Sequence, residues 1–257
     1  MFGTGEFARL PAGWAPQPDT LRGRVVLVVG ATGALGRAAA LAAARAGASV
    51  VLLGRKVRAL EKVYDEITAL QAATPAIYPL DLGGATPRDY GELAATLERE
   101  YGRLDGILHA AAHFEGLRPA SDIAPEEWMR ALHVNLTAPF LLTQACLPLL
   151  QAAPDASVVF VLDDPARMGK AHWGGYGTAK HALAGIASIL HEETDSSALR
   201  VHALLPAPMR STLRRTAYFG ENTVALSGPE ASADAAVYLL GADAVSARGR
   251  ILDLRAQ

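Results

Sequence analysis

The sequence has little cysteine, few aromatic residues and no excess of one charge. Its single cysteine, Cys146, excludes an internal disulfide and a cysteine-rich metal site, and we expect it to pack in the core. Lys and Arg (24) nearly balance Asp and Glu (26), so the net charge of −2 predicts no nucleic-acid-binding surface. Aromatic residues make up 6% of a chain that is 51% hydrophobic, which predicts a core of small aliphatic side chains.

Long hydrophobic runs are also missing. No window holds 18 uninterrupted apolar residues, which argues against a membrane span. The first twenty residues include Glu6 and Arg9 and lack the apolar stretch of a signal peptide, so we expect a cytoplasmic protein. Residues 1–22 are rich in glycine and proline and show no periodicity, which predicts an extended arm before a single domain over 23–257.

The chain does have a regular alternation of short apolar runs and helical patterns. The predicted strands cover 24–29, 49–53, 76–80, 104–109, 157–162, 200–205 and 250–254. The predicted helices cover 34–46, 57–70, 87–101, 125–151, 174–194 and 229–240. Strands with few polar residues are typical of a parallel sheet that helices cover on both faces. The alternation therefore predicts an α/β fold, a Rossmann-type doubly wound parallel sheet of about seven strands with helices on both faces.

A glycine-rich loop follows the first predicted strand, in the segment VVGATGALGR over 28–37. Glycines at a strand-to-helix turn let backbone N–H groups approach a pyrophosphate, and the helix N-terminus favours an anion. The cofactor contacts predicted here are Gly30, Thr32, Gly33, Leu35, Gly36 and Arg37. The alternative is that the glycines serve only the packing of helix against strand.

The second predicted strand ends in cations. In a dinucleotide-binding fold, an acid at this point binds the free 2′-hydroxyl of the ribose, whereas an arginine accommodates a 2′-phosphate. Arg55 and Lys56 stand here in place of the acid, and Arg37 begins the first helix nearby. We therefore predict NADP rather than NAD as the cofactor. The alternative is that Arg55 simply begins an amphipathic surface helix.

The helix predicted after the fifth of these strands contains the segment Tyr176-Gly-Thr-Ala-Lys180, preceded by Trp173-Gly-Gly. With the glycine loop ahead of it and Asn135 in the long helix between, this segment resembles the short-chain dehydrogenase/reductase family. Within that family it is similar to the bacterial NADP-type oxidoreductases that have a WGxYxxxK motif. The resemblance covers nearly the whole chain, residues 21–254.

The resemblance implies hydride transfer between NADP(H) and a small carbonyl or alcohol substrate. Tyr176 would protonate the carbonyl oxygen, or take the alcohol proton in the reverse direction. Lys180, four residues later on the same helix face, would favour the phenolate and hold the nicotinamide ribose. Asn135 would interrupt its helix and anchor a water that connects Lys180 to solvent. Asp81 and Leu82, after the third predicted strand, would border the adenine.

One departure from the family falls on a catalytic position. The family's catalytic serine lies thirteen residues before the tyrosine, and this chain has Asp163 there. A serine donates a hydrogen bond to the substrate oxygen, whereas an ionised aspartate cannot donate and raises the pKa of a neighbouring phenol. We keep Asp163 among the catalytic positions and predict weakened catalysis. The alternative, an acid/base or metal pair with Asp164, meets the objection that adjacent strand residues point to opposite faces.

Two further departures flank the predicted cofactor. The family's Asn-Ala-Gly after the fourth of these strands is Ala110-Ala111-Ala112 here, and its Pro-Gly after the sixth is Pro206-Ala207. We count all five residues as cofactor contacts. Because alanine adds a methyl group where the backbone approaches the dinucleotide, we expect cofactor binding to survive at reduced affinity.

Other residues leave alternatives open. His109 and His113 are spaced as metal ligands could be, although they lie on a strand end and loop, so we do not predict a metal. Trp173 either lines the mouth of the substrate site or simply packs. Residues 209–219 occupy the place of the family's substrate lid. The arginines of this lid either favour an acidic substrate or face water; they are Arg210, Arg214 and Arg215.

Two functions remain open. The first is an NADP(H)-dependent oxidoreductase, which the ordered family motifs favour. The second is a catalytically weakened relative that binds NADP(H) as a sensor or partner protein, which Asp163 and residues 110–112 favour. The resemblance also implies a homodimer or homotetramer built on the helices that contain residues 135–150 and 177–193. The charge pattern predicts no nucleic-acid or membrane partner.

Overall fold

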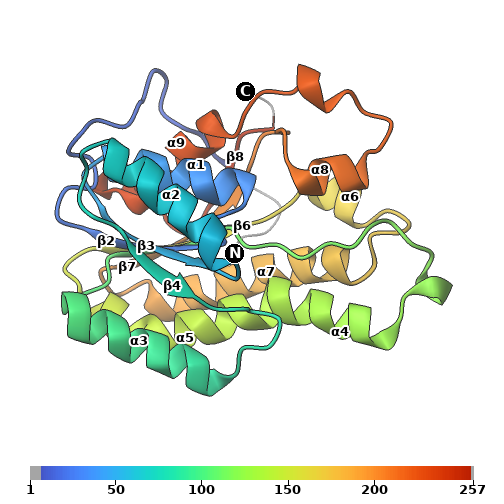
Figure 1. Cartoon of the computed structure of the whole chain (residues 1–257), viewed down its shortest axis with the longest axis horizontal. Coiled ribbons are helices and arrows are strands. Elements are labelled where there is room, and N and C mark those ends of the chain that lie inside the picture. The colour runs from blue at the N-terminus through green and yellow to red at the C-terminus, as the bar shows by residue number, and fades with distance from the viewer. Residues whose placement is uncertain (1–6, 256–257) are drawn as a thin grey trace.

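The computed structural model describes residues 7–255, and Figure 1 shows their arrangement. Its strands are β1 (Phe7–Ala8), β2 (Val25–Val29), β3 (Ser49–Gly54), β4 (Ala76–Pro79), β5 (Gly106–His109), β6 (Ala156–Val161), β7 (Leu199–Leu205) and β8 (Ile251–Asp253). They form one parallel sheet in the order β1-β8-β7-β6-β5-β2-β3-β4. The strand order reverses beside β2, so the predicted doubly wound Rossmann-type sheet is confirmed, with β1 as a strand beyond the predicted seven.

Helices cover both faces of this sheet. They are α1 (Ala34–Arg45), α2 (Val57–Ala69), α3 (Pro87–Tyr101), α4 (Pro125–Leu132), α5 (Ala138–Ala152), α6 (Pro165–Met168), α7 (Gly174–Thr194), α8 (Thr212–Ala217) and α9 (Glu230–Leu240). In Figure 1, α1, α2 and α9 lie on one face and α3, α5 and α7 on the other. Alternate strand residues enter the two cores: Val26 and Val28 pack toward α1, Val25 and Leu27 toward the opposite layer. Double burial explains why the strands are apolar throughout.

The predicted arm spans residues 1–22, of which residues 1–6 lie outside the described part of the chain. The described part packs against the domain. β1 pairs with the edge strand β8, and the ring of Trp14 meets Tyr238 of α9 edge-on, with centroids 5.1 Å apart. Leu21 is fully buried. The segment has no periodicity because it crosses the surface and contributes single anchoring side chains.

The long helix predicted over 125–151 changes geometry in its middle. α4 passes through a π-helical turn, His133–Thr137, into α5. Asn135 lies in this turn and is buried. Its amide nitrogen donates to the carbonyls of Ala131 and His113, both at 2.8 Å, and its oxygen accepts the N–H of His113 at 2.9 Å. The side chain thus ties the loop after β5 to the helix.

The carboxyl ends of the parallel strands meet at one edge of the sheet, beside the point where the strand order reverses. Open α/β sheets bind their ligands at such a point. No helix within residues 7–255 is long and apolar enough to cross a membrane.

Candidate active site

A cavity of about 930 Å³ lies at this edge of the sheet. Its lining includes many of the predicted site residues: Thr32, Gly33, Leu35, Ala110, Ala112, Asp163, Tyr176, Lys180, Pro206 and Ala207. The other predicted site residues are placed outside this lining: Gly30, Gly36, Arg37, Arg55, Asp81, Leu82, Ala111 and Asn135. The fold therefore brings Asp163, Tyr176 and Lys180 into one cavity with part of the glycine loop.

The glycines of the loop after β2 serve two different purposes. Gly30 has a φ of +85°, and a Cβ there would lie 2.6 Å from the Cα of Ala111, which packs behind the loop. A Cβ on Gly36 would collide with the Gly30 carbonyl. At Gly33 an added Cβ would meet only the Gly30 carbonyl oxygen, at 3.4 Å. Two glycines therefore allow close packing, and Gly33 leaves space on the cavity side.

The N-terminus of α1 opens into the same cavity. Gly33 is its N-cap residue, the first turn contains no acidic side chain, and no side chain among residues 7–255 caps it. Uncapped N–H groups and the helix dipole favour an anion at this point. Together with the open space at Gly33, this chemistry fits the pyrophosphate of a dinucleotide.

The cations predicted to select NADP have different surroundings. The Arg37 guanidinium forms an ion pair with Glu66 on α2, at 2.6 Å. Arg55, directly after β3, is exposed and forms no ion pair in the described chain. Asp81 is exposed, whereas Leu82 is buried in the core. Arg55 and the likewise exposed Lys56 therefore form no ion pair in the described chain, whereas Arg37 does.

Three of the four predicted catalytic side chains come together. The Tyr176 hydroxyl donates to Oδ2 of Asp163, at 2.8 Å. Lys180 Nζ donates to the carbonyl of Val161, at 2.7 Å, and lies 5.7 Å from the centre of the Tyr176 ring. Tyr176 and Lys180 share a face of α7 because they are four residues apart. Asn135, the fourth, bonds the backbone of the loop after β5.

Burial sets the electrostatics of this group. It raises the pKa of Tyr176 well above its usual value, and Asp163 adds to the rise through its charge and its hydrogen bond. Burial also lowers the pKa of Lys180 to about 8, and Asp163 partly opposes that effect. Lys180 therefore stays mostly charged at neutral pH, while Tyr176 keeps its proton and directs it toward Asp163.

Aromatic side chains form a wall beside Tyr176. Trp173 stacks on Phe114 with ring centroids 5.3 Å apart, and it lies 5.9 Å from Tyr176 and 6.0 Å from Tyr218. Trp173 is 7% exposed yet lines the cavity, so it both packs in the interior and borders the cavity. Sequence reasoning missed Phe114, which belongs to no motif. Tyr218 falls in the predicted lid but has no local signal of its own.

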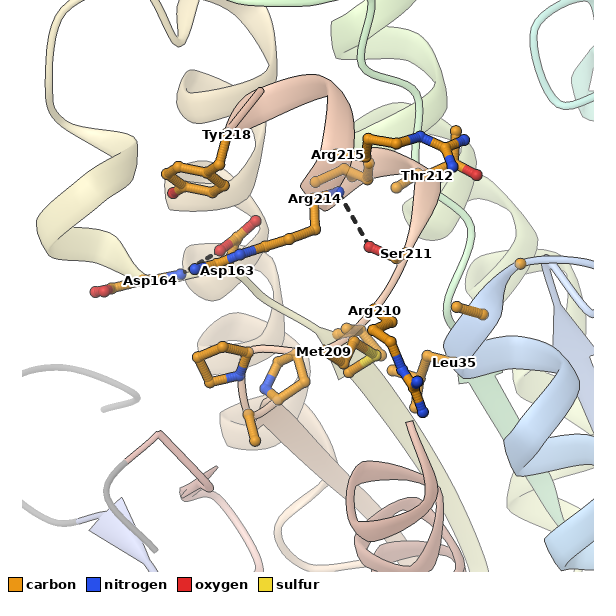
Figure 2. A pocket seen from close by; sticks show the side chains of 18 of the residues that line it. Leu35, Asp163, Asp164, Met209, Arg210, Ser211, Thr212, Arg214, Arg215 and Tyr218 are labelled. Atoms are coloured by element: carbon orange, nitrogen blue, oxygen red, sulfur yellow. Dashed lines mark hydrogen bonds between the residues drawn. The ribbon is translucent and has the colours of Figure 1, made fainter. Parts of the chain in front are cut away.

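The neighbouring acid, Asp164, has a separate role. It caps α6 by accepting the Ala166 N–H at 3.1 Å, and it forms ion pairs with Arg255 and Arg167. Figure 2 shows the carboxylates of Asp163 and Asp164 pointing in different directions. The Asp-Pro pair at an N-cap was a usable signal for α6. Arg255 is far away in the sequence, so no local pattern could place it here.

The two histidines considered as metal ligands are separated. His109 is buried, with Nε2 2.8 Å from Oγ1 of Thr143. Burial and, secondarily, the charge of Lys180 lower the pKa of His109 to about 3, so it is neutral. His113 instead pairs with Glu115, at 3.0 Å. Each histidine is thus engaged with its own neighbour.

Comparisons with known proteins identify relatives of this chain. A family model described as short chain dehydrogenase matches residues 24–221. The oxidoreductase YciK of Escherichia coli K12 is 35% identical over 240 residues, which cover 93% of this chain and 95% of YciK. A short chain dehydrogenase from Pseudomonas syringae is 39% identical, with a TM-score of 0.89 over 98% of this chain and 99% of that one. A short chain dehydrogenase from Escherichia coli CFT073, in complex with NADPH, is 36% identical, with a TM-score of 0.88 over 93% and 99%. With this extent of similarity and a shared fold, the chain belongs to the short-chain dehydrogenase family.

Proposed function

We propose that this protein is an NADP(H)-dependent oxidoreductase that transfers hydride to or from a carbonyl or alcohol substrate. The observation that supports this best is the buried Tyr176–Lys180 pair in the cavity that reaches the glycine loop. Arg55 provides the cation that a 2′-phosphate requires, and a relative of known structure was crystallised with NADPH. The substrate is a small molecule whose carbonyl or hydroxyl oxygen reaches Tyr176.

The chain offers a distinct group for each part of the cofactor. The N–H groups at the start of α1, with Gly33, would hold the pyrophosphate. Ala110, Ala112, Pro206 and Ala207 line the same cavity as Lys180 and would border the nicotinamide half. Bound NADP(H) supplies or accepts the hydride.

The proton comes from the chain itself. In the reducing direction, the Tyr176 hydroxyl gives its proton to the carbonyl oxygen while hydride reaches the carbon. The resulting phenolate is stabilised by the charge of Lys180, which the Val161 carbonyl holds below the ring. In the oxidising direction the phenolate takes the alcohol proton. A group this strongly buried needs that nearby cation to ionise at all.

Asp163 opposes this chemistry. Its carboxylate accepts the hydrogen bond of the Tyr176 hydroxyl, so a substrate oxygen has to compete with Asp163 for that proton. An ionised carboxylate also provides no donor for the substrate oxygen. Loss of such a donor costs about 10²–10³ in kcat elsewhere. We therefore propose slow turnover on simple ketones.

Binding followed by turnover tests the proposal. NADPH and NADH are titrated by calorimetry, and a panel of aldehydes, ketones and alcohols is then followed by NADPH absorbance. We expect tighter binding of NADPH and measurable turnover. Tyr176→Phe should keep the cofactor affinity and lose the turnover, because it removes only the hydroxyl. Absence of NADPH binding, or equal turnover in Tyr176→Phe, would contradict the proposal.

A second function is favoured by the same Tyr176–Asp163 hydrogen bond. A phenol with a raised pKa, bound to a carboxylate, suits a protein that binds NADP(H) as a sensor or partner without efficient catalysis. This function predicts NADPH binding with no turnover across the panel. It also predicts that Asp163→Ser gains an activity that the natural chain lacks.

We further propose a homodimer or homotetramer formed through α5 and α7. Phe140 on α5 is 36% exposed and Ile189 on α7 is 59% exposed, which leaves apolar side chains on these helices for a second copy to cover. Light scattering at micromolar concentration should give a mass above that of one chain, and Ile189→Lys should lower it. A monomeric mass for the natural chain would contradict the proposal.

A further inference from the structure

Arg210 projects into the cavity from an anchored backbone. It follows β7 in the lid segment, where the preceding Met209 is buried in the core. The N–H of Arg210 donates to the carbonyl of Ser227 at 3.1 Å, and the N–H of Ala207 donates to Oγ of Ser232 at 3.2 Å. These contacts hold the backbone at and just before Arg210, whose exposed side chain lines the cavity.

The side chain points toward the glycine loop. Figure 2 shows Arg210 extending from the lid toward Leu35 in the first turn of α1. Arg210, Gly33 and Leu35 line the same cavity. The guanidinium therefore shares this cavity with the start of α1, which presents uncapped N–H groups and no acidic side chain.

Charge pairing sets Arg210 apart from most arginines of the cavity. Arg214 forms a bidentate pair with Glu221, with N···O distances of 2.6 and 2.7 Å. Arg167 pairs with Asp164, and Arg255 pairs with Asp164 and Asp253. The Arg210 and Arg215 side chains have no partner among residues 7–255.

The two arginines of the cavity that have no partner in the described chain are drawn at different places in Figure 2. In Figure 2, Arg215 is drawn at the upper edge with α8, whereas Arg210 is drawn low, beside Leu35. A pyrophosphate at the α1 N-terminus would therefore face Arg210 and not Arg215. The planar guanidinium can form paired hydrogen bonds to phosphate oxygens.

We propose that Arg210 is a pyrophosphate ligand supplied by the lid, on the side opposite the N–H groups of α1. This inference rests on the proposed NADP(H) binding and adds a residue for which neither the glycine loop nor the Tyr/Lys motif gives a signal. It also couples the lid to the cofactor, because the same segment, residues 209–219, borders the substrate space.

The test compares two ligands and three variants by calorimetry. NADPH contains the pyrophosphate, whereas adenosine 2′-monophosphate keeps the adenine half and the 2′-phosphate but lacks it. Arg210→Ala should weaken NADPH binding about tenfold or more, the contribution of a hydrogen bond to a charged group. It should leave the affinity for adenosine 2′-monophosphate unchanged. Arg210→Lys should lose less, because it keeps the charge, and Arg215→Ala is the matched control with unchanged NADPH affinity.

Thermal melting of each variant checks the fold, which should be intact because neither guanidinium has a partner in the described chain. Unchanged NADPH affinity in Arg210→Ala would overturn the inference and leave the proposed function standing. An equal loss for both ligands, or an equal loss in Arg215→Ala, would also overturn it. If the natural chain binds no NADPH, the proposed function fails and this inference fails with it.

Discussion

The two ends of the parallel sheet both bury ionisable side chains, but the surroundings of these side chains differ. At the amino end, Arg200 on β7 is 2% exposed, and its guanidinium binds Asp155 and the carbonyl of Gly241. Arg24 binds the other oxygen of the same carboxylate. Nearby, Arg248 donates to carbonyls at the end of α7. Each of these three guanidinium groups thus donates to at least one acceptor.

At the carboxyl end, burial shifts the pKa values of three ionisable side chains away from their usual values. Burial raises the pKa of Tyr176 and lowers that of Lys180 to about 8 and that of His109 to about 3. Burial lowers the pKa of Arg200 and of His202 on β7 as well. What distinguishes the carboxyl end is that two of its shifted groups, Tyr176 and Lys180, line the cavity. This difference supports the proposal that the carboxyl end carries out proton transfer, which Asp163 restrains.

The largest expected effect on stability belongs to the amino end. Arg200→Met should lower the free energy of unfolding by about 3 kcal/mol, near the lower figure for breaking a buried pair, because Asp155 keeps Arg24. Urea denaturation measures it. Arg88→Met is the matched control: its ion pair with Glu92 is exposed, so the loss should be below about 0.5 kcal/mol. Similar losses in the two variants would erase the contrast between buried and surface pairs.

Lowering the pH should destabilise the protein through two buried histidines. Burial, followed by the charge of a nearby cation, lowers the pKa of His109 at the carboxyl end and of His202 on β7 to about 3. The unfolded chain protonates these histidines near pH 6.5, as free histidine does, and the folded chain does not. Their contribution to stability is therefore complete above about pH 6.5 and is lost as pH falls toward about 3.

Around pH 5 the slope of unfolding free energy should reach about 2.7 kcal/mol per pH unit for two protons. Urea titrations between pH 7 and 5 measure it, and His202→Asn should reduce the slope by about half. A flat profile in the natural chain would show that these histidines protonate in the folded state.

A smaller effect is expected at the cofactor end. Arg55→Ala should weaken NADPH binding about tenfold and leave NADH unchanged, because only NADPH has the 2′-phosphate. Arg37→Ala should cost less, since Glu66 already holds that guanidinium. Calorimetry with both cofactors measures the two variants. A larger effect of Arg37→Ala would mean that the Arg37–Glu66 ion pair opens when NADPH binds. Arg37, and not Arg55, would then be the main ligand of the 2′-phosphate.

The sequence was most informative where function depends on local spacing. The glycines of the α1 loop and the Tyr176–Lys180 pair were predictable because a turn or one helix face places them. The apolar runs likewise predicted seven strands of the sheet. β1, with two residues, is too short to show a period, so it could not be found.

Contacts between distant segments could not be predicted. Arg255 reaches Asp164 from the far end of the chain, and Arg37 meets Glu66 only because α1 and α2 pack together. The separation of Asp163 from Asp164 depends on the turn into α6. These features follow from tertiary packing, which leaves no pattern along the sequence.

The most direct test of the account is the kcat of Asp163→Ser with the best substrate of the carbonyl panel at saturating NADPH. The account predicts an increase of about tenfold or more, because the variant frees the Tyr176 proton and restores a donor to the substrate oxygen. NADPH affinity should change little, and Asp163→Asn, which removes the charge but keeps an acceptor oxygen beside the Tyr176 hydroxyl, should fall between. Brisk turnover by the natural chain and a slower Asp163→Ser would contradict the account and make Asp163 a catalytic donor.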